Sequence, residues 1–245
     1  MITVAVVGAA GRMGATVVRA VEDADDLELA AALDMDDEIS TATAAGAGVA
    51  VEFTVPASSE ANVLALIDAG LHVVVGTSGW TEDALDRVRK RLENAPGIGV
   101  IVVPNFALGA VLAARFAAEA APYFESAEVI ELHHPDKVDA PSGTARATAA
   151  RIAAARAEAG LGDMPDATAS SLDGARGARV DGVPVHSIRL RGLVAHQEVV
   201  LGNPGETLTL RHDSLDRASF MPGVLLAIRR VADRPGLTVG LDALL

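Results

Sequence analysis

Two histidines, one lysine and a predicted helix start lie within the fourteen residues from Glu131 to Thr144. Histidine exchanges a proton near neutral pH, and lysine can do so when its surroundings lower its pKa. The backbone N–H groups that open a helix bind anions. The segment therefore combines three proton-transfer groups, His133, His134 and Lys137, with an anion-binding element at Ser142–Thr144.

Lys137 is notable because lysine is rare in this chain. Of the 20 basic residues only Lys90 and Lys137 are lysines, and the others are arginines. A guanidinium stays protonated at any ordinary pH, whereas an ammonium can be tuned and can release its proton. The choice of lysine favours a proton donor at position 137. The alternative is a solvated lysine without a role in the site, as expected for Lys90 in its charged segment.

The composition limits the possible classes of protein. The 245 residues suit one large domain or two modest ones, and the absence of cysteine excludes disulfides, thiolate metal sites and cysteine nucleophiles. A net charge of −13 opposes binding to nucleic acid or anionic membranes, so an anionic ligand must be held by local groups. No signal-type segment is seen, and no apolar run reaches the ~20 residues that span a bilayer. We expect a cytoplasmic protein.

Short β-branched runs alternate with helical segments through the first half of the chain. Such alternation predicts parallel strands joined by right-handed crossovers and buried on both faces. The expected fold class is α/β, with a Rossmann-like doubly wound parallel sheet. The predicted strands are Ile2–Val7, Leu27–Leu33, Val49–Phe53, Val73–Val75 and Val100–Val103, and the predicted helices are Met13–Val21, Ser59–Ala69 and Glu82–Leu92.

The pattern changes after Pro104 and indicates a second, α+β domain with a mixed sheet. We expect a dinucleotide-binding domain at residues 1–105, joined by residues 216–245, and a substrate-binding and oligomerisation domain at residues 106–215. The predicted elements are a helix at Leu108–Ala121, a strand from Ala127 to about His133, a helix from Ser142 to near Gly160, a loop at Gly160–Gly182, antiparallel strands at Val185–Leu190, Val194–Leu201 and Thr207–His212 with turns at Gly192 and Asn203–Gly205, and a final helix at Phe220–Val231 followed by a short tail.

Three glycines, Gly8, Gly11 and Gly14, connect the first predicted strand to the first helix. Glycines there allow a tight turn and the close approach of a pyrophosphate. The G-x-x-G-x-x-G spacing departs from the strict pattern, but Asp34 ends the second strand 20 residues further on and can accept from ribose hydroxyls. Together these features predict dinucleotide binding. No arginine stands beside Asp34 to receive a 2′-phosphate, so NADH is favoured over NADPH, although Arg12 could reach a phosphate of either.

The segment Glu131–Ala145 resembles the signature of the 4-hydroxy-tetrahydrodipicolinate reductase (dihydrodipicolinate reductase) family. The glycine turn, Gly76–Gly79 and Pro104–Phe106 support the resemblance, which runs along the whole chain. It implies an enzyme of the diaminopimelate route to lysine. Such an enzyme delivers a hydride from NADH or NADPH to a cyclic, conjugated imine dicarboxylate. The resemblance also implies a homotetramer.

The resemblance further implies a role for individual residues. His133 would be a proton donor or acceptor and Lys137 a proton donor. The substrate would be held by His134, Gly143 and Thr144. The cofactor would be bound by Gly8, Ala9, Ala10, Gly11, Arg12, Met13 and Asp34, with Gly76, Thr77, Ser78, Val103, Pro104, Asn105 and Phe106 flanking its nicotinamide end.

Three positions depart from the family pattern. Ser78 replaces a threonine found in many members but keeps the hydroxyl. Glu52 stands where aspartate is expected, which leaves its role open. Ala10 occupies a position that can be basic, so Arg12 is the only cation of the turn.

Several alternatives stay open. Ser142 also fits an ordinary helix N-cap. A metal site of His133, His134 and Asp136 is a rival, but adjacent histidines before a proline fit zinc spacing poorly, and no metal is expected. A dehydrogenase of the glucose–fructose or aspartate dehydrogenase type would carry a Glu-Lys-Pro-like motif at Gly76–Gly79. A non-catalytic dinucleotide sensor would have no reason to pair a histidine with Lys137.

Overall fold

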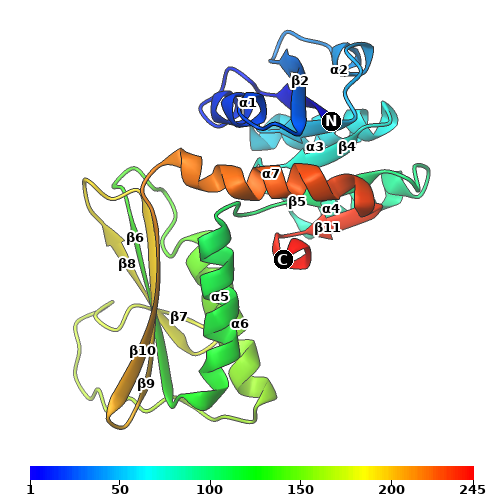
Figure 1. Ribbon diagram of the computed structural model, residues 1–245. Coiled ribbons are helices and arrows are strands. Elements are labelled where there is room, and N and C mark those ends of the chain that lie inside the picture. The colour runs from blue at the N-terminus through cyan, green and yellow to red at the C-terminus, as the bar shows by residue number, and fades with distance from the viewer. The chain divides into compact units, whose positions relative to one another are not determined.

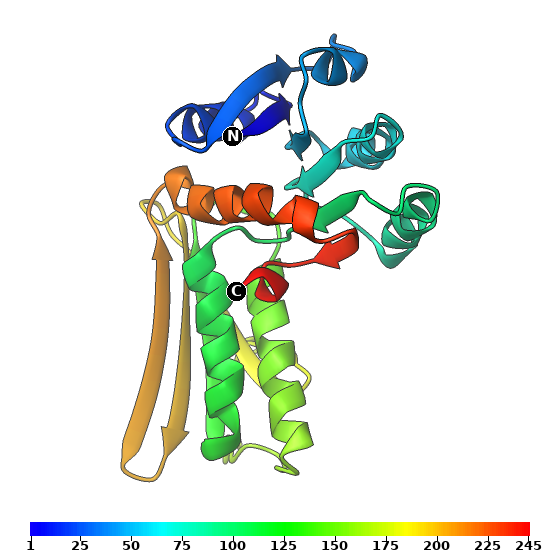
Figure 2. The same ribbon diagram turned by 45° about the vertical axis from the view of Figure 1, so that its right-hand side comes forward.

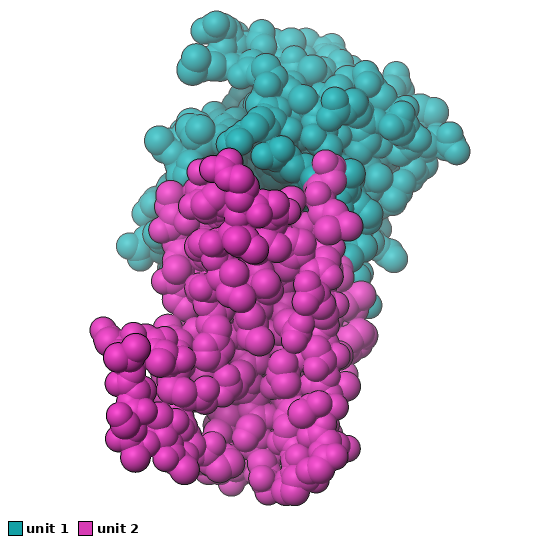
Figure 3. Space-filling model, turned by 90° about the vertical axis from the view of Figure 1, so that its left-hand side faces the viewer, with its two compact units in different colours: residues 1–108, 217–245 teal, residues 109–216 magenta.

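The computed structural model describes residues 1–245, and the chain forms two compact units. Unit 1 comprises Met1–Leu108 and Arg217–Leu245, and unit 2 comprises Gly109–Asp216 (Figure 3). None of the helices combines the length and the apolar character that crossing a lipid bilayer requires.

Unit 1 is built on a six-stranded sheet in which every neighbouring pair is parallel. The central strands are buried on both faces, which explains their continuous apolar runs. The strand order is β11-β5-β4-β3-β1-β2, with β1 (Ile2–Val7), β2 (Leu27–Leu33), β3 (Val49–Glu52), β4 (His72–Val75), β5 (Gly99–Val102) and β11 (Gly236–Val239) (Figure 1).

Helices pack against this sheet and complete the core of unit 1. Leu66 and Ile67 of α3 and Leu85 and Val88 of α4 pack in one cluster with the strands, while α7 contacts α1. Helix α4 shows a consistent local design, because Thr81 caps its first turn and basic residues occupy its last. The helices of the unit are α1 (Gly14–Glu22), α2 (Ser40–Ala44), α3 (Pro56–Asp68), α4 (Glu82–Leu92) and α7 (Met221–Arg230), with 3-10 turns at Arg217–Phe220, Val231–Asp233 and Asp242–Leu244.

Unit 2 is a mixed five-stranded sheet whose one face is covered by two helices (Figure 2). Buried small and branched residues form its core, among them Ala117, Val129, Ile152 and Val199. The strand order is β10-β9-β6-β8-β7, with β6 (Ser126–His133), β7 (Ala178–Val180), β8 (Val183–Arg189), β9 (Ala195–Asn203) and β10 (Glu206–Ser214). The helices are α5 (Leu108–Ala120) and α6 (Gly143–Glu158), with a 3-10 turn at Ala121–Tyr123.

The order of strands in unit 2 corrects one prediction. The turn at Gly192 was expected to join two paired antiparallel strands, but β6 lies between β8 and β9 and runs parallel to β8. The chain passes the end of β6 in this turn, where the Leu190 N–H donates to the His133 carbonyl at 3.1 Å. A turn glycine indicates a reversal of direction, but it does not reveal that an earlier strand lies between the two arms. The hairpin at Asn203–Gly205 is confirmed, since Asn203 pairs with Glu206.

Three short elements were missed: α2, β7 and β11. β7 lies in the segment predicted as a loop, and β11 lies in the predicted tail. They span three to five residues, too few to show a period. The other predicted helices and strands both begin and end within three residues of their predicted bounds. Val103, for example, was predicted in β5 but follows it. The predicted fold class is confirmed.

Candidate active site

The turn between β1 and α1 has the geometry of a phosphate-binding loop. Gly8 has a φ of 86°, and a Cβ atom there would lie 2.3 Å from the Phe53 carbonyl oxygen. A Cβ atom at Gly14 would lie 2.0 Å from the Gly8 carbonyl oxygen, so neither glycine can be replaced without moving the backbone. Helix α1 begins at Gly14 with no side-chain cap and no acidic residue in its first turn. Its N-terminal dipole is therefore unopposed and suited to an anion.

The Asp34 carboxylate lies against this turn. Its Oδ2 accepts from the Ala10 N–H at 2.8 Å and its Oδ1 accepts from the Met35 N–H at 2.9 Å. Because the side chain is exposed and each carboxylate oxygen accepts more than one hydrogen bond, it can still receive ribose hydroxyls. The structure thus brings together two predicted cofactor elements and gives Asp34 a second task, which is to hold the turn.

Phe53, directly after β3, joins the predicted cofactor segments of unit 1. Its carbonyl lies beneath Gly8, and its ring packs so closely on Gly76 that a Cβ atom there would lie 2.1 Å from the ring. The ring centroid is 5.6 Å from that of Phe106, at an interplanar angle of 45°. Sequence reasoning did not assign Phe53 a role. One signal was available: an aromatic residue, rare in this chain, directly follows a buried strand.

Glu52, whose role was open, is completely buried in unit 1. Its carboxylate accepts from the Ser59 hydroxyl at 2.7 Å and from both the N–H and the hydroxyl of Thr54. The Thr54 N–H also donates to the Thr77 hydroxyl at 2.8 Å. Glu52 therefore ties the end of β3 to α3 and to the segment after β4. Ser78, which follows Thr77 in that segment, is exposed.

The remaining predicted cofactor residues follow β5. Val103 and Phe106 are buried, Pro104 is exposed, and the Asn105 side-chain oxygen accepts from the Ala107 N–H at 2.9 Å. This segment and the glycine-bearing segment after β4 both leave the carboxyl ends of neighbouring parallel strands. That edge of a doubly wound sheet is where such folds bind their ligands.

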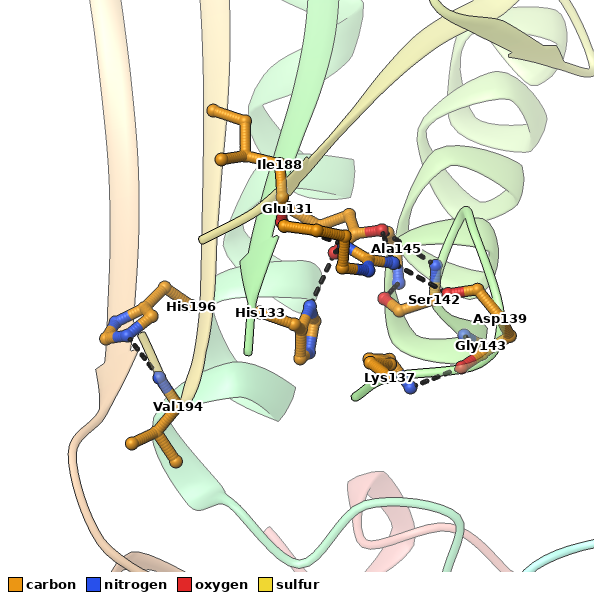
Figure 4. A network of polar contacts seen from close by, with 11 residues as sticks. Glu131, His133, Lys137, Asp139, Ser142, Gly143, Ala145, Ile188, Val194 and His196 are labelled. Carbon is orange, nitrogen blue, oxygen red and sulfur yellow. Dashed lines mark hydrogen bonds and ion pairs between the residues drawn. The ribbon is translucent and has the colours of Figure 1, made fainter. Parts of the chain in front are cut away.

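In unit 2, His133 is the last residue of β6, and Glu131 lies on the same face two positions earlier. His133 Nδ1 is 2.5 Å from Glu131 Oε2 (Figure 4). Burial alone would raise the pKa of Glu131, but hydrogen bonds from Arg189, Ser187 and His133 hold that pKa at about 2. The Glu131 side chain is therefore ionised at neutral pH.

The pKa of His133 is lowered from its ordinary value. Burial is the largest cause, and the cations of Lys137 and Arg189 act in the same direction. The Glu131 carboxylate opposes them and raises the pKa of His133. Since the net shift is downward, the ring is mainly neutral at pH 7.

Lys137 and the start of α6 meet at one carboxylate. Lys137 Nζ is 2.5 Å from Asp139 Oδ1, and the Gly143 N–H donates to Asp139 Oδ2 at 3.2 Å (Figure 4). The Lys137 side chain is 24% exposed, so it does not extend into bulk solvent. Ser142 is the N-cap of α6, because its hydroxyl accepts from the Ala145 N–H at 3.1 Å.

The other residues predicted to bind substrate lie nearby in unit 2. Strand β6 ends before His134, which is exposed and whose carbonyl accepts from the Lys137 N–H at 3.3 Å. Gly143 has open space where a side chain would be, and Thr144 follows it in the first turn of α6. His133, Lys137 and Gly143 are thus brought together by contacts that run through Glu131 and Asp139, two residues to which sequence reasoning gave no role.

Three of the four remaining histidines have polar partners, and the ring of the fourth, His212, packs against Gly109. His72 accepts from the Gly99 N–H at 3.0 Å, His186 pairs with Glu128, and His196 Nδ1 lies 2.7 Å from Asp213. The rival metal site has no geometric support, since no three His, Asp or Glu side chains are grouped to hold a metal ion.

Two family models cover nearly the whole chain. Dihydrodipicolinate reductase, N-terminus, matches residues 2–106, and dihydrodipicolinate reductase, C-terminus, matches residues 107–245. The chain belongs to the dihydrodipicolinate reductase family. The expectation drawn from Glu131–Ala145 is confirmed, and with it the assignment as an oxidoreductase of lysine and diaminopimelate biosynthesis. The family uses NADH or NADPH.

Individual relatives agree with the family. A 4-hydroxy-tetrahydrodipicolinate reductase of Beutenbergia cavernae is 64% identical over 244 residues, which is 100% of this chain and 98% of the relative. The same enzyme of Streptomyces griseus is 62% identical over 239 residues, 98% of this chain and 96% of the relative. Among solved structures, a dipicolinate-bound dihydrodipicolinate reductase from Paenisporosarcina is 36% identical and covers both chains completely, with a TM-score of 0.89.

Solved dehydrogenase structures of low sequence identity resemble this chain in fold alone. A probable dehydrogenase from Thermotoga maritima has a TM-score of 0.63 at 12% identity, over 98% of this chain and 91% of its own.

Proposed function

We propose that this member of the reductase family catalyses the NAD(P)H-dependent reduction of 4-hydroxy-tetrahydrodipicolinate (dihydrodipicolinate) to tetrahydrodipicolinate. The observation that carries the proposal is the carboxylate of Asp139 between the Lys137 ammonium and the Gly143 N–H. These two donors already bind one acid group, and a charge-assisted pair of this kind suits a carboxylate of the substrate equally well. The relative from Paenisporosarcina, solved with dipicolinate, supports a dicarboxylate ligand.

In this proposal one substrate carboxylate is bound by Lys137, Gly143 and Thr144. The first turn of α6 adds the positive end of a helix dipole, with Ser142 setting the start of the helix. His134, exposed at the end of β6, contributes a further hydrogen-bond donor or acceptor. The substrate is thus anchored in unit 2.

Lys137 and His133 handle the protons. Hydride addition to a conjugated imine leaves negative charge, which a nearby acid must quench. The Lys137 ammonium is the donor, because its contact with Asp139 keeps it near the substrate carboxylate and partly out of water. His133, mainly neutral at pH 7, exchanges protons through the ring nitrogen that does not face Glu131.

The residues of the proposed cofactor site in unit 1 fit a dinucleotide. The uncapped start of α1 and the tight turn that Gly8 and Gly14 allow suit a pyrophosphate, and Asp34 accepts the ribose hydroxyls. A bound nicotinamide supplies the hydride. No basic side chain accompanies Asp34, so NADH is favoured. The proposed set is Gly8, Ala9, Ala10, Gly11, Arg12, Met13, Asp34, Gly76, Thr77, Ser78, Val103, Pro104, Asn105 and Phe106.

A turnover assay tests the proposed function. The substrate is made in situ by the upstream synthase from pyruvate and aspartate semialdehyde, and NADH is followed by its absorbance. We expect NADH oxidation that depends on both the synthase and the purified chain. Oxidation no faster than in the synthase-free control would overturn the proposal. Repeating the assay with NADPH measures the cofactor preference.

We also propose a homotetramer, assembled through the sheet face of unit 2 that α5 and α6 leave uncovered. Alternation along the strands places Ile130 and Leu132 of β6, Val200 of β9 and Ile188 of β8 on that face. Ile188 is 40% exposed in the single chain. Light scattering coupled to size exclusion should report four copies, and Ile188→Asp should reduce that number. A wild-type monomer would contradict this proposal.

A further inference from the structure

Glu131 is a completely buried carboxylate on which three segments of unit 2 converge. Arg189 of β8 donates to both of its oxygens, each at 2.8 Å. The Ser142 N–H, at the start of α6, donates to Oε1 at 3.1 Å, and His133 Nδ1 lies 2.5 Å from Oε2. Because the carboxylate is completely buried, these protein groups take the place of water as its hydrogen-bond partners.

We propose that Glu131, paired with Arg189, is the positioning residue of the active site, because it holds His133 in the tautomer that carries its hydrogen on Nδ1. The catalytic role of the other nitrogen, Nε2, rests on the proposed function. The tautomer itself is a property of the protein without substrate, so the two can fail separately.

The chemistry of the contact determines the tautomer. An ionised carboxylate only accepts hydrogen bonds, so the hydrogen in the 2.5 Å contact must come from His133 Nδ1. Nε2 then has a free lone pair, and it lies on the side of the ring away from Glu131 (Figure 4). A buried carboxylate without a cation would take up a proton, and Arg189 prevents this by its paired hydrogen bonds.

The same guanidinium also positions the lysine. Arg189 donates to the Asp139 carbonyl at 2.6 Å, and the Asp139 carboxylate holds Lys137. The ion pair between Glu131 and Arg189 therefore connects the His133 ring, the Lys137 loop and the start of α6.

The charges that act on His133 come from three elements. Glu131 lies on its own strand, Arg189 comes from β8 and Lys137 from the loop after β6. Strand β9 places the uncharged Ala195 opposite it. Removal of the Glu131 charge leaves only the two cations, so the pKa of His133 should fall further.

The chain offers a matched control on the same strand. Glu128 accepts from a histidine, His186, at 2.7 Å and also pairs with an arginine, Arg176. Glu128→Gln makes the same chemical change as Glu131→Gln, at a glutamate–histidine–arginine group that touches no residue of the proposed site.

The test combines NMR with kinetics on the full-length enzyme. Two-bond ¹⁵N–¹H correlation spectra of histidine-labelled protein, with His133→Asn for assignment, should show hydrogen on His133 Nδ1 in the wild type. Glu131→Gln should populate the Nε2–H form, lower the pKa of His133, and lower kcat about 10²-fold with a smaller change in KM. Glu128→Gln should leave the His133 signals and kcat unchanged. Glu131→Asp, which keeps the charge, should recover part of the lost kcat.

Two results would overturn the proposal. One is a wild-type spectrum with the hydrogen on Nε2, which decides the matter even if Glu131→Gln does not fold. The other is a folded Glu131→Gln with wild-type kcat. A wild type that has the Nδ1–H form but does not oxidise NADH would instead leave the positioning contact standing and refute the proposed function.

Discussion

The carboxylate of Asp139 lies 2.5 Å from the ammonium of Lys137 and, through its second oxygen, accepts the Gly143 N–H at 3.2 Å. Lys137 lowers the pKa of Asp139, so this carboxylate is charged at neutral pH. In the absence of substrate, it occupies the donors that we assign to a substrate carboxylate. A dicarboxylate must therefore displace it or share those donors with it.

Asp139→Asn should tighten the binding of dipicolinate. The amide can still accept the Gly143 N–H, but it no longer repels the incoming carboxylate. We expect the Kd from calorimetry to fall about fivefold, close to 1 kcal/mol. Asp136→Asn, at an exposed position in the same loop, is the control and should leave Kd unchanged. Weaker binding by Asp139→Asn would mean that this carboxylate assists the ligand.

Lys137→Ala should lower kcat by ~10²-fold or more, the usual effect of losing a general acid. Lys137→Arg should recover substrate binding but little of kcat, because a guanidinium does not release its proton. Lys90→Ala changes the only other lysine and should behave as wild type. The measurement is steady-state NADH oxidation, and near-normal kcat in Lys137→Ala would refute the proton role.

Asp34→Ala should weaken the binding of NADH more than the binding of NADPH, since only NADH offers both hydroxyls of its adenosine ribose to the carboxylate. Both cofactors should lose some affinity, because Asp34 also holds the Ala10 N–H of the turn. Fluorescence titrations give the two Kd values, with the exposed neighbour Asp36→Ala as the control. Equal losses for the two cofactors would show that Asp34 acts only on the turn.

Gly76→Ala should destabilise unit 1. The new methyl group would lie 2.1 Å from the Phe53 ring, which must move and in turn disturb its contact with Phe106. Overpacking of this kind costs about 1–3 kcal/mol, measurable by urea unfolding. Gly97→Ala, where nothing lies within 4 Å, is the matched control. Unchanged stability and NADH affinity in Gly76→Ala would show that the ring relocates without cost.

Glu131 should make the protein sensitive to acid. Its pKa is lowered from 4.5 to about 2 on folding, so its contribution is complete above pH ~4.5 and is lost as the pH falls toward 2. That shift corresponds to about 3 kcal/mol. Urea unfolding between pH 6 and 3 should show a smaller loss in Glu131→Gln than in wild type, whereas Glu125→Gln, at an exposed position, should follow wild type. If the free energy of unfolding fell equally with pH in wild type and Glu131→Gln, the lowered pKa of Glu131 would be contradicted.

The sequence was sufficient to predict features that depend on neighbouring residues. The buried strands of unit 1 appear as apolar runs, β6 ends at His133 as predicted, and Ser142 caps α6. The glycine turn and Asp34 were placed from spacing alone, and they do meet.

Features that join distant segments were not predictable in this way. Arg189 is 58 residues from Glu131, and nothing in the local pattern of either indicates the other. Two further features also join segments that are distant in the sequence. They are the position of β6 between β8 and β9 and the contact of Phe53 with Gly76. The position of a residue in the chain suggested which groups could react, but the groups that orient them emerged only from the folded structure.

The return of residues 217–245 to unit 1 has a consequence for synthesis on the ribosome. Strand β11, at one of the two edges of the parallel sheet, is translated after all of unit 2, so the inserted unit can complete its own core before this edge strand exists. During synthesis, β5 of unit 1 therefore stays unpaired on one side until the segment that follows unit 2 has been translated.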